Sequence, residues 1–323
     1  MKRTFALWAF CLTMAPELTY ASAKDDMLPE TERYDASKSG LDQAPTHALV
    51  ETLVDDHVKA ALAVTHASES IAATADAAAA RLETEGRLIY VGAGTSGRLG
   101  VLDAVELWPT FGWLSERVDF LMAGGERALI HAVEGAEDDE GAAVKAFEKC
   151  CAEEHDVFIL LSASGGAPYV NKIAELAGKA GALTIGISSV KDSPLLANVA
   201  HPIYVATGAE SLQGSTRLKA GTAQKIVLST LSTAVMMRLG YVFEGLMINV
   251  QATNAKLVKR RLRITCELTK LEEKEAQDLL IRAQGDNRIA LLMHRKHLSY
   301  EDAKVRLDAH FGNVRKALDS LPY

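Results

Sequence analysis

Five short apolar runs, separated by segments of helical character, constrain the fold of this chain more than any other feature. Each run is rich in β-branched or large aliphatic residues, which is typical of buried strands. Strands that alternate with helices form parallel sheets covered by helices on both faces, so the pattern predicts an α/β fold. Such sheets bind ligands at the carboxyl ends of their strands, and we expect a site in the loops that follow the runs. The runs are Leu88–Val91, Val118–Met122, Val157–Leu161, Leu183–Ile187 and Ile203–Val205.

The composition excludes several classes of protein. The chain has 323 residues, of which 48% are hydrophobic and 24% charged, so it is long enough to bury a core and too apolar to remain disordered. Its net charge of −7 argues against a general nucleic-acid binder, which needs a basic surface. The four cysteines form neither a disulfide framework nor a C-x-x-C pair, and the histidines form no H-x-x-x-H motif, so we expect no metal site.

The first 26 residues allow two interpretations. A basic start, an apolar stretch from Phe5 to Met14 and the small residues Ala21–Ala23 are typical of a secretory signal. A translation start at Met27 would instead make residues 1–26 an upstream extension. The segment is too short to span a membrane, and no later segment offers about 20 uninterrupted apolar residues.

The rest of the chain divides into three parts. We expect an arm and a helix over residues 27–65, the α/β domain over 66–240 and a small helical region over 241–323. Capping-box sequences predict helix starts at Thr269 and Ser299 in the last part. Helical spacing in the first part places several apolar residues on one face, namely Val50, Val54, Val58, Ala61 and Leu62.

Two polar loops follow predicted strands directly. Gly92–Arg98 (GAGTSGR) is a glycine-rich turn that opens a helix, where free N–H groups and the helix dipole favour a phosphate. It also matches G-x-G-x-x-G, but the end of the second strand, Met122–Gly125, lacks the acid that a dinucleotide site uses on the ribose. Ser162–Gly166 (SASGG) follows the third strand. Each loop alone can be a simple turn, but together they favour a sugar-phosphate site over a dinucleotide site.

Longer motifs give this prediction a family. The two loops resemble those of the sugar isomerase (SIS) domain, an α/β fold. Four segments are similar to the N-acetylmuramic acid 6-phosphate etherases, and Thr31–Arg33 with Leu41–Asp42 resembles that family's start. A eukaryotic relative, the glucokinase regulatory protein, binds sugar phosphates without catalysis, so resemblance alone leaves a binding protein open. The four segments are Gly92–Gly100 (GAGTSGRLG), His131–Asp139 (HAVEGAEDD), Ser215–Lys225 (STRLKAGTAQK) and Ala252–Leu257 (ATNAKL).

The resemblance implies a carbon–oxygen lyase that needs no cofactor or metal. It would cleave the D-lactyl ether of N-acetylmuramate 6-phosphate by elimination and then add water, using two carboxylates in different protonation states. By motif position, Glu106 matches the acid that protonates the departing lactate, and Glu137 matches the second carboxylate, the base at C2. Glu134 is the nearest rival to Glu137. Without the resemblance, Glu106 would be a helix-end acid, and Glu137 an acid near the start of a helix.

The resemblance also implies the anion ligands, and the chain departs from the family near some of them. Gly166 and Ala167 replace an arginine and a threonine that are common in the second loop, which should weaken anion binding. Val105 and Leu107 make the surroundings of Glu106 apolar, and Asn249 replaces a common aspartate. The expected ligands are Gly94, Thr95, Ser96, Arg98, Ser162, Ser164, Arg217 and Lys219.

Several functional alternatives remain at this point. A silent sugar-phosphate sensor, an aldose–ketose isomerase and, more distantly, a nicotinamide oxidoreductase would each use the same scaffold. The family implies a homodimer. A substrate phosphorylated inside the cell favours a cytoplasmic protein that begins at Met27, rather than an exported one.

Overall fold

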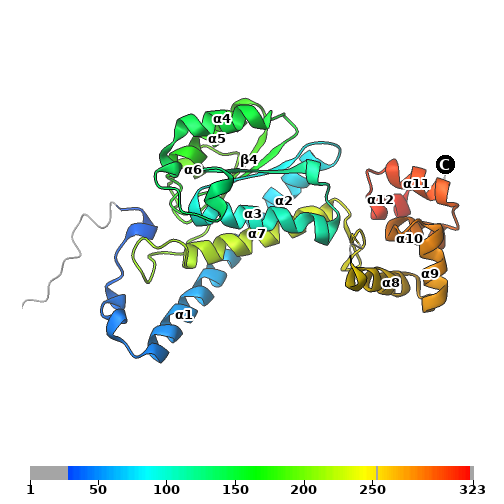
Figure 1. The fold of residues 1–323 in the computed structure, drawn as a ribbon, viewed down its shortest axis with the longest axis horizontal. Helices are drawn as coiled ribbons and strands as arrows, with labels where there is room; N and C mark the ends of the chain where they lie inside the picture. Colours follow the sequence, from blue (N-terminus) through cyan, green and yellow to red (C-terminus); the bar gives the residue numbers. More distant parts are fainter. Residues whose placement is uncertain (1–27, 252–253, 321–323) are drawn as a thin grey trace, which may run out of the picture.

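A computed structural model describes residues 28–251 and 254–320, and it contains the predicted parallel sheet. The signal-like segment 1–26 lies outside the described residues. The strand order is β2-β1-β3-β4-β5, with every pair parallel, so the predicted α/β fold is confirmed. Helices pack around this sheet (Figure 1). The last strand begins two residues earlier than its apolar run. The strands are β1 Leu88–Gly92, β2 Val118–Met122, β3 Val157–Leu161, β4 Leu183–Ser188 and β5 His201–Tyr204.

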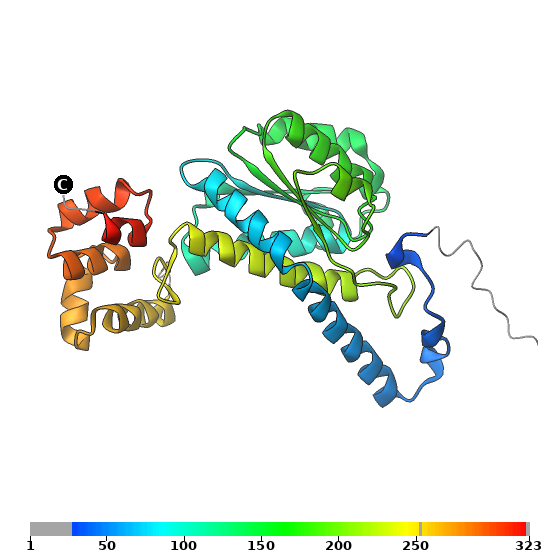
Figure 2. The ribbon, with the colours of Figure 1, turned by 180° about the vertical axis from the view of Figure 1, so that it is seen from behind.

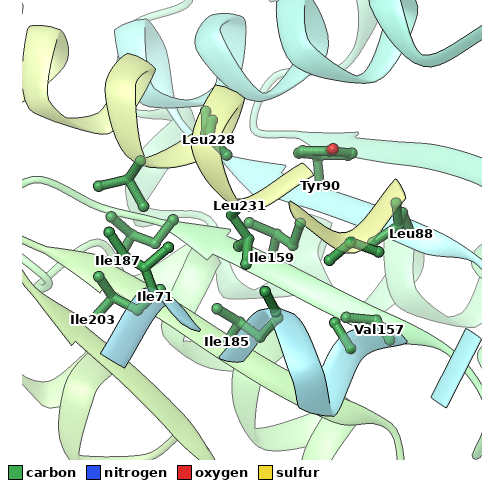
Figure 3. Packing of buried hydrophobic residues seen from close by; sticks show 14 of the residues in the cluster. Ile71, Leu88, Tyr90, Val157, Ile159, Ile185, Ile187, Ile203, Leu228 and Leu231 are labelled. Atoms are coloured by element: carbon green, nitrogen blue, oxygen red, sulfur yellow. The ribbon is translucent and has the colours of Figure 1, made fainter. Parts of the chain in front are cut away.

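Helices cover both faces of the sheet because its strands are apolar on both faces. In β1, Tyr90 packs on one side, while Ile89 and Val91 pack on the other, as the two-residue period of a strand requires. On the Tyr90 side, Ile71 and Leu228 meet the sheet (Figure 3). Helices α2 Ser68–Leu82, α3 Gly94–Phe111 and α7 Lys219–Arg238 cover this side, and α4 Glu140–Cys150, α5 Pro168–Lys179 and α6 Pro194–Ala197 cover the other.

The sheet order positions the candidate site. β1 lies between β2 and β3, so the chain reverses its direction of strand addition there. Gly92 at the end of β1 pairs with Leu161 at the end of β3. The loops after these two strands therefore leave the sheet side by side, at the switch point where parallel α/β sheets bind ligands.

The N-terminal part is an arm of short turns followed by a long helix. The turns are η2 Glu30–Glu32, η3 Ala36–Lys38 and η4 Leu41–Gln43, and the helix is α1 Thr46–Thr65, which extends away from the sheet (Figures 1 and 2). α1 packs on α7 through other residues, and Val50, Val54, Val58 and Leu62 of the predicted apolar face are each more than half exposed.

The C-terminal part is helical and has its own core. Between residues 254 and 320, five helices follow a short hairpin of β6 Val242–Phe243 and β7 Leu246–Met247, which the sequence did not predict. The helix start at Ser299 is confirmed, because its hydroxyl accepts from the N–H of Asp302. The predicted start at Thr269 is wrong: this buried residue ends α8, and Glu272 caps the next helix. The helices are α8 Ala255–Thr269, α9 Glu273–Arg282, α10 Asn287–Lys296, α11 Tyr300–Asp308 and α12 Val314–Asp319.

Within residues 28–251 and 254–320, no helix is long and apolar enough to cross a membrane.

Candidate functional site

A polar cavity of about 280 Å³ lies where the loops after β1 and β3 meet. Both predicted loops line it, and so does Glu137, so the structure brings together most of the residues that the sequence selected. Glu32, Gly214 and Thr216 also line it, although the sequence analysis did not select them. The full lining is Glu32, Ala93, Gly94, Thr95, Ser96, Glu137, Leu161, Ser162, Ala163, Ser164, Ala167, Gly214 and Thr216.

The first loop supplies main-chain donors at the start of α3. The first-turn N–H groups of a helix have no acceptor within the helix. Ala93, which precedes α3, offers no side-chain acceptor to these groups either. A Cβ at Gly97 would lie 2.7 Å from the carbonyl oxygen of Gly92, so only glycine allows this tight strand-to-helix turn. The Ser96 hydroxyl donates to Gln224 on α7 at 2.9 Å, which leaves the main chain of Ser96 to meet a ligand. This arrangement suits a phosphate.

The second loop adds hydroxyl groups at the end of β3. Ser162 is buried, and Ser164 accepts from the N–H of Gly166 at 3.2 Å, so the Ser164 hydroxyl proton is available to a ligand. Gly165 has a φ of 68°, and a Cβ there would lie 2.3 Å from the Ser193 side chain, so glycine is required. Gly166 is exposed and brings no side chain toward an anion.

Glu137 lies on η7 Ala136–Asp138, an exposed turn of the long connection between β2 and α4. Arg98 fastens this connection to α3. Its Nε donates to the carbonyl of Ala128 at 3.0 Å, and its Nη2 donates to that of His131 at 3.0 Å. Arg98 does not line the cavity, so the structure does not place it as the phosphate ligand that the sequence predicted.

Glu106 lies elsewhere in this chain. It is exposed on α3 and lines a second cavity of about 170 Å³, together with Asp103 and Lys225. Asp103 accepts from the Tyr90 hydroxyl at 2.7 Å and from Ser232 at 3.2 Å. Burial raises the pKa of Asp103, and these two hydrogen bonds oppose the rise. The two predicted catalytic carboxylates therefore do not share a cavity within one chain.

The two basic residues of the long motif also lie outside the cavity. Arg217 is exposed, whereas Lys219 is buried at the start of α7. The Glu210 carboxylate accepts from the N–H groups of Lys219 and Ala220, both at 2.9 Å, and so caps α7. In the same motif, Thr216 reaches the cavity instead.

No group of three or more histidine, cysteine, aspartate or glutamate side chains is arranged to hold a metal ion in the described part of the chain.

Two family models match the domain that contains this cavity. The model of the glucokinase regulatory protein N-terminal SIS domain matches residues 70–178, and that of the SIS domain matches 148–234. A phosphoheptose isomerase from Francisella tularensis is 17% identical, with a TM-score of 0.44 over 60% of this chain and 100% of that one.

The parallel sheet and its paired loops define a protein of the SIS class. An N-acetylmuramic acid 6-phosphate etherase from Deinococcus radiodurans is 46% identical over 89% of this chain and 94% of its own length. An N-acetylmuramic acid 6-phosphate etherase 1 from Enterococcus faecalis is 40% identical over 89% and 96%. The chain belongs to the N-acetylmuramic acid 6-phosphate etherase family.

Proposed function

We propose that this protein cleaves the D-lactyl ether of N-acetylmuramate 6-phosphate, giving N-acetylglucosamine 6-phosphate and D-lactate. The observation that carries the proposal is one cavity that joins an uncapped helix start, two serine hydroxyls and Glu137, in a chain of this family. The helix start and the serines of the second loop would hold the phosphate. The sugar then extends toward Glu137.

The reaction proceeds on the open-chain sugar. The C1 aldehyde acidifies the C2 proton, which the Glu137 carboxylate removes. The electrons form the C2–C3 double bond, and the C3–oxygen bond breaks as Glu106 protonates the departing lactate oxygen. Water then adds at C3: its hydroxyl group joins C3, and a proton returns to C2. A base and an acid with different protonation states can catalyse both the elimination and the addition of water.

The separation of Glu106 from Glu137 supports a homodimer in which two chains build each site. Leu102, Val105 and Trp108 are exposed around Glu106 on α3, and α1 carries a second exposed apolar face. Monomeric proteins rarely expose apolar patches of this kind. A two-fold dimer would bury these surfaces and bring the Glu106 of one subunit to the cavity of the other.

The test is D-lactate release from N-acetylmuramate 6-phosphate, measured for the wild type, Glu106→Gln and Glu137→Gln. Each variant alone should lose at least about a hundredfold in kcat, because general acid–base groups contribute that much or more. After mixing and subunit exchange, activity should return to about a quarter of the wild-type value, because half of the dimers are mixed and each has one intact site. Glu134→Gln is the matched control and should keep its activity.

Two results would contradict these proposals. A folded wild type that releases no lactate at high substrate would contradict the etherase activity. Mixed variants that stay inactive would place both glutamates in sites built by single chains. Gly166 and Ala167, which replace an arginine and a threonine common in the family, favour a second candidate function, a silent sugar-phosphate sensor. Such a sensor would bind the substrate in calorimetry without turning it over.

We also propose that the protein works in the cytoplasm, where sugars are phosphorylated at the 6 position during uptake or by kinases. We propose that the chain divides into an N-terminal extension or signal-like segment over 1–26, an arm and helix over 27–65, the sugar-phosphate domain over 66–240 and the helical region over 241–323.

A further inference from the structure

Glu32 brings a second carboxylate to the cavity that holds Glu137. It lies in the arm, 60 residues before the start of the first loop in sequence, and ends the turn η2. Neighbouring Thr31 is completely buried, so this turn packs against the body of the protein. The position of Glu32 at the cavity is therefore a property of the folded arm.

Hydrogen bonds fix the turn to the end of β5 and to the loop beyond it. The Tyr204 hydroxyl donates to the Glu30 carboxylate at 2.8 Å, and the Gln213 amide donates to the main-chain carbonyl of Glu32 at 2.9 Å. Both contacts leave the Glu32 carboxylate unused. They hold the Glu30 side chain and the Glu32 backbone in place, so they fix the position from which the Glu32 side chain extends.

The Glu32 carboxylate lies against Gly214. A Cβ at Gly214 would be 2.8 Å from Oε2 of Glu32, so the glycine makes room for this carboxylate. Among the residues that the structure describes, no hydrogen bond or ion pair engages the Glu32 carboxylate. A half-buried, unpaired carboxylate in a polar cavity is available to a ligand that donates hydrogen bonds.

The charge of Glu32 decides which part of the ligand it meets. A carboxylate repels a phosphate, which must lie at the start of α3 where N–H groups and the helix dipole favour it. Hydroxyl and amide N–H groups of the sugar, in contrast, donate to a carboxylate in charge-assisted bonds. We propose that Glu32 is a specificity-determining residue that accepts hydrogen bonds from the neutral donor groups of the sugar. This inference rests on the proposed sugar-phosphate site.

Calorimetric binding of two ligands tests this role without turnover. For N-acetylglucosamine 6-phosphate, Glu32→Gln should raise Kd about tenfold and Glu32→Ala further, because glutamine keeps a neutral acceptor. For inorganic phosphate, both variants should bind as tightly as the wild type or more tightly, because a nearby negative charge has been removed. Asp42→Asn changes an exposed acid of the same arm and should leave both affinities unchanged.

The outcomes separate the alternatives. Equal weakening of both ligands would overturn the proposal and make Glu32 only a support of the arm. Unchanged affinity for the sugar phosphate would also overturn it. If Glu32→Gln stops lactate release without changing either Kd, Glu32 transfers protons instead. A wild type that binds the sugar phosphate but releases no lactate contradicts the etherase activity alone, and the Glu32 comparison still stands.

Discussion

The Arg98 side chain links the helix start that would hold the phosphate to the connection that carries Glu137. It lies one turn after the amides assigned to the phosphate, and it donates to carbonyls of the connection that carries Glu137. The sequence identified Arg98 as part of a phosphate motif, but it could not give the direction of the side chain. Its acceptors are main-chain carbonyls about 30 residues away, and carbonyls leave no mark on residue type.

Arg98→Met should lower kcat by about tenfold or more, because even a small misplacement of a catalytic base strongly lowers the reaction rate. KM should change less, since Arg98 does not line the cavity. Arg98→Lys keeps one donor, so its kcat should lie between those of the wild type and Arg98→Met. Steady-state kinetics of lactate release measure the split. A raised KM with normal kcat would return Arg98 to the role of phosphate ligand.

The arm and α1 are the elements that the sequence explained least. The strands and their loops were predictable because apolar runs and glycine turns are local signals. The docking of the arm depends on single long-range contacts. Buried Asp56 on α1 accepts from Lys38 in the arm at 3.2 Å, and Ser211 beyond β5 also donates to it. No local pattern marks such a partner, so Glu32 could not be placed at the cavity from the sequence.

Asp56 should make stability depend on pH in the acid range. Burial alone would raise the pKa of Asp56, but hydrogen bonds from Ser211, Lys59 and Lys38 outweigh it and lower the pKa to about 2. A carboxyl with a lowered pKa stabilises the fold above its unfolded value, 3.8, and loses that contribution as the pH falls toward 2.

Asp56→Asn should therefore lower the free energy of unfolding by about 2 kcal/mol at pH 7. The difference in the free energy of unfolding between the variant and the wild type should become smaller as the pH falls from about 4 to about 2. Urea unfolding across this range measures it, and Asp55→Asn, which changes an exposed neighbour, is the control. A difference that stays constant down to pH 2 would show that Asp56 acts through packing alone.

The whole molecule presents apolar faces that no other described residue of the chain covers. Helix α1 extends beyond the sheet domain (Figure 2). Its exposed apolar face is formed by Val50, Val54, Val58 and Leu62. The sequence indicated this face correctly, but apolar spacing cannot tell whether a helix packs on its own chain or on a second copy.

The double variant Val54→Asp with Val58→Asp should dissociate the proposed dimer and remove most of the etherase activity, because charged residues are unfavourable at the centre of an interface. Sedimentation equilibrium gives the mass, and lactate release gives the activity. Ile281→Asp changes an even more exposed apolar residue, on α9, and should leave both the mass and the activity unchanged. A double variant that remains dimeric would exclude α1 as the contact surface.

The contacts that hold the arm against the sheet domain determine how sugar recognition can be lost. Glu32 reaches the cavity while the arm stays folded against the body of the protein, through buried Thr31 and the hydrogen bonds of η2. Among the described residues, the apolar core on the Tyr90 side of the sheet contains none from this arm. Release of the arm would remove Glu32 from the cavity and the Lys38 contact from Asp56, without opening the core of the sheet. Under the role proposed for Glu32, a protease cut between η4 and α1 that releases the arm should weaken binding of the sugar and leave the start of α3 to bind the phosphate.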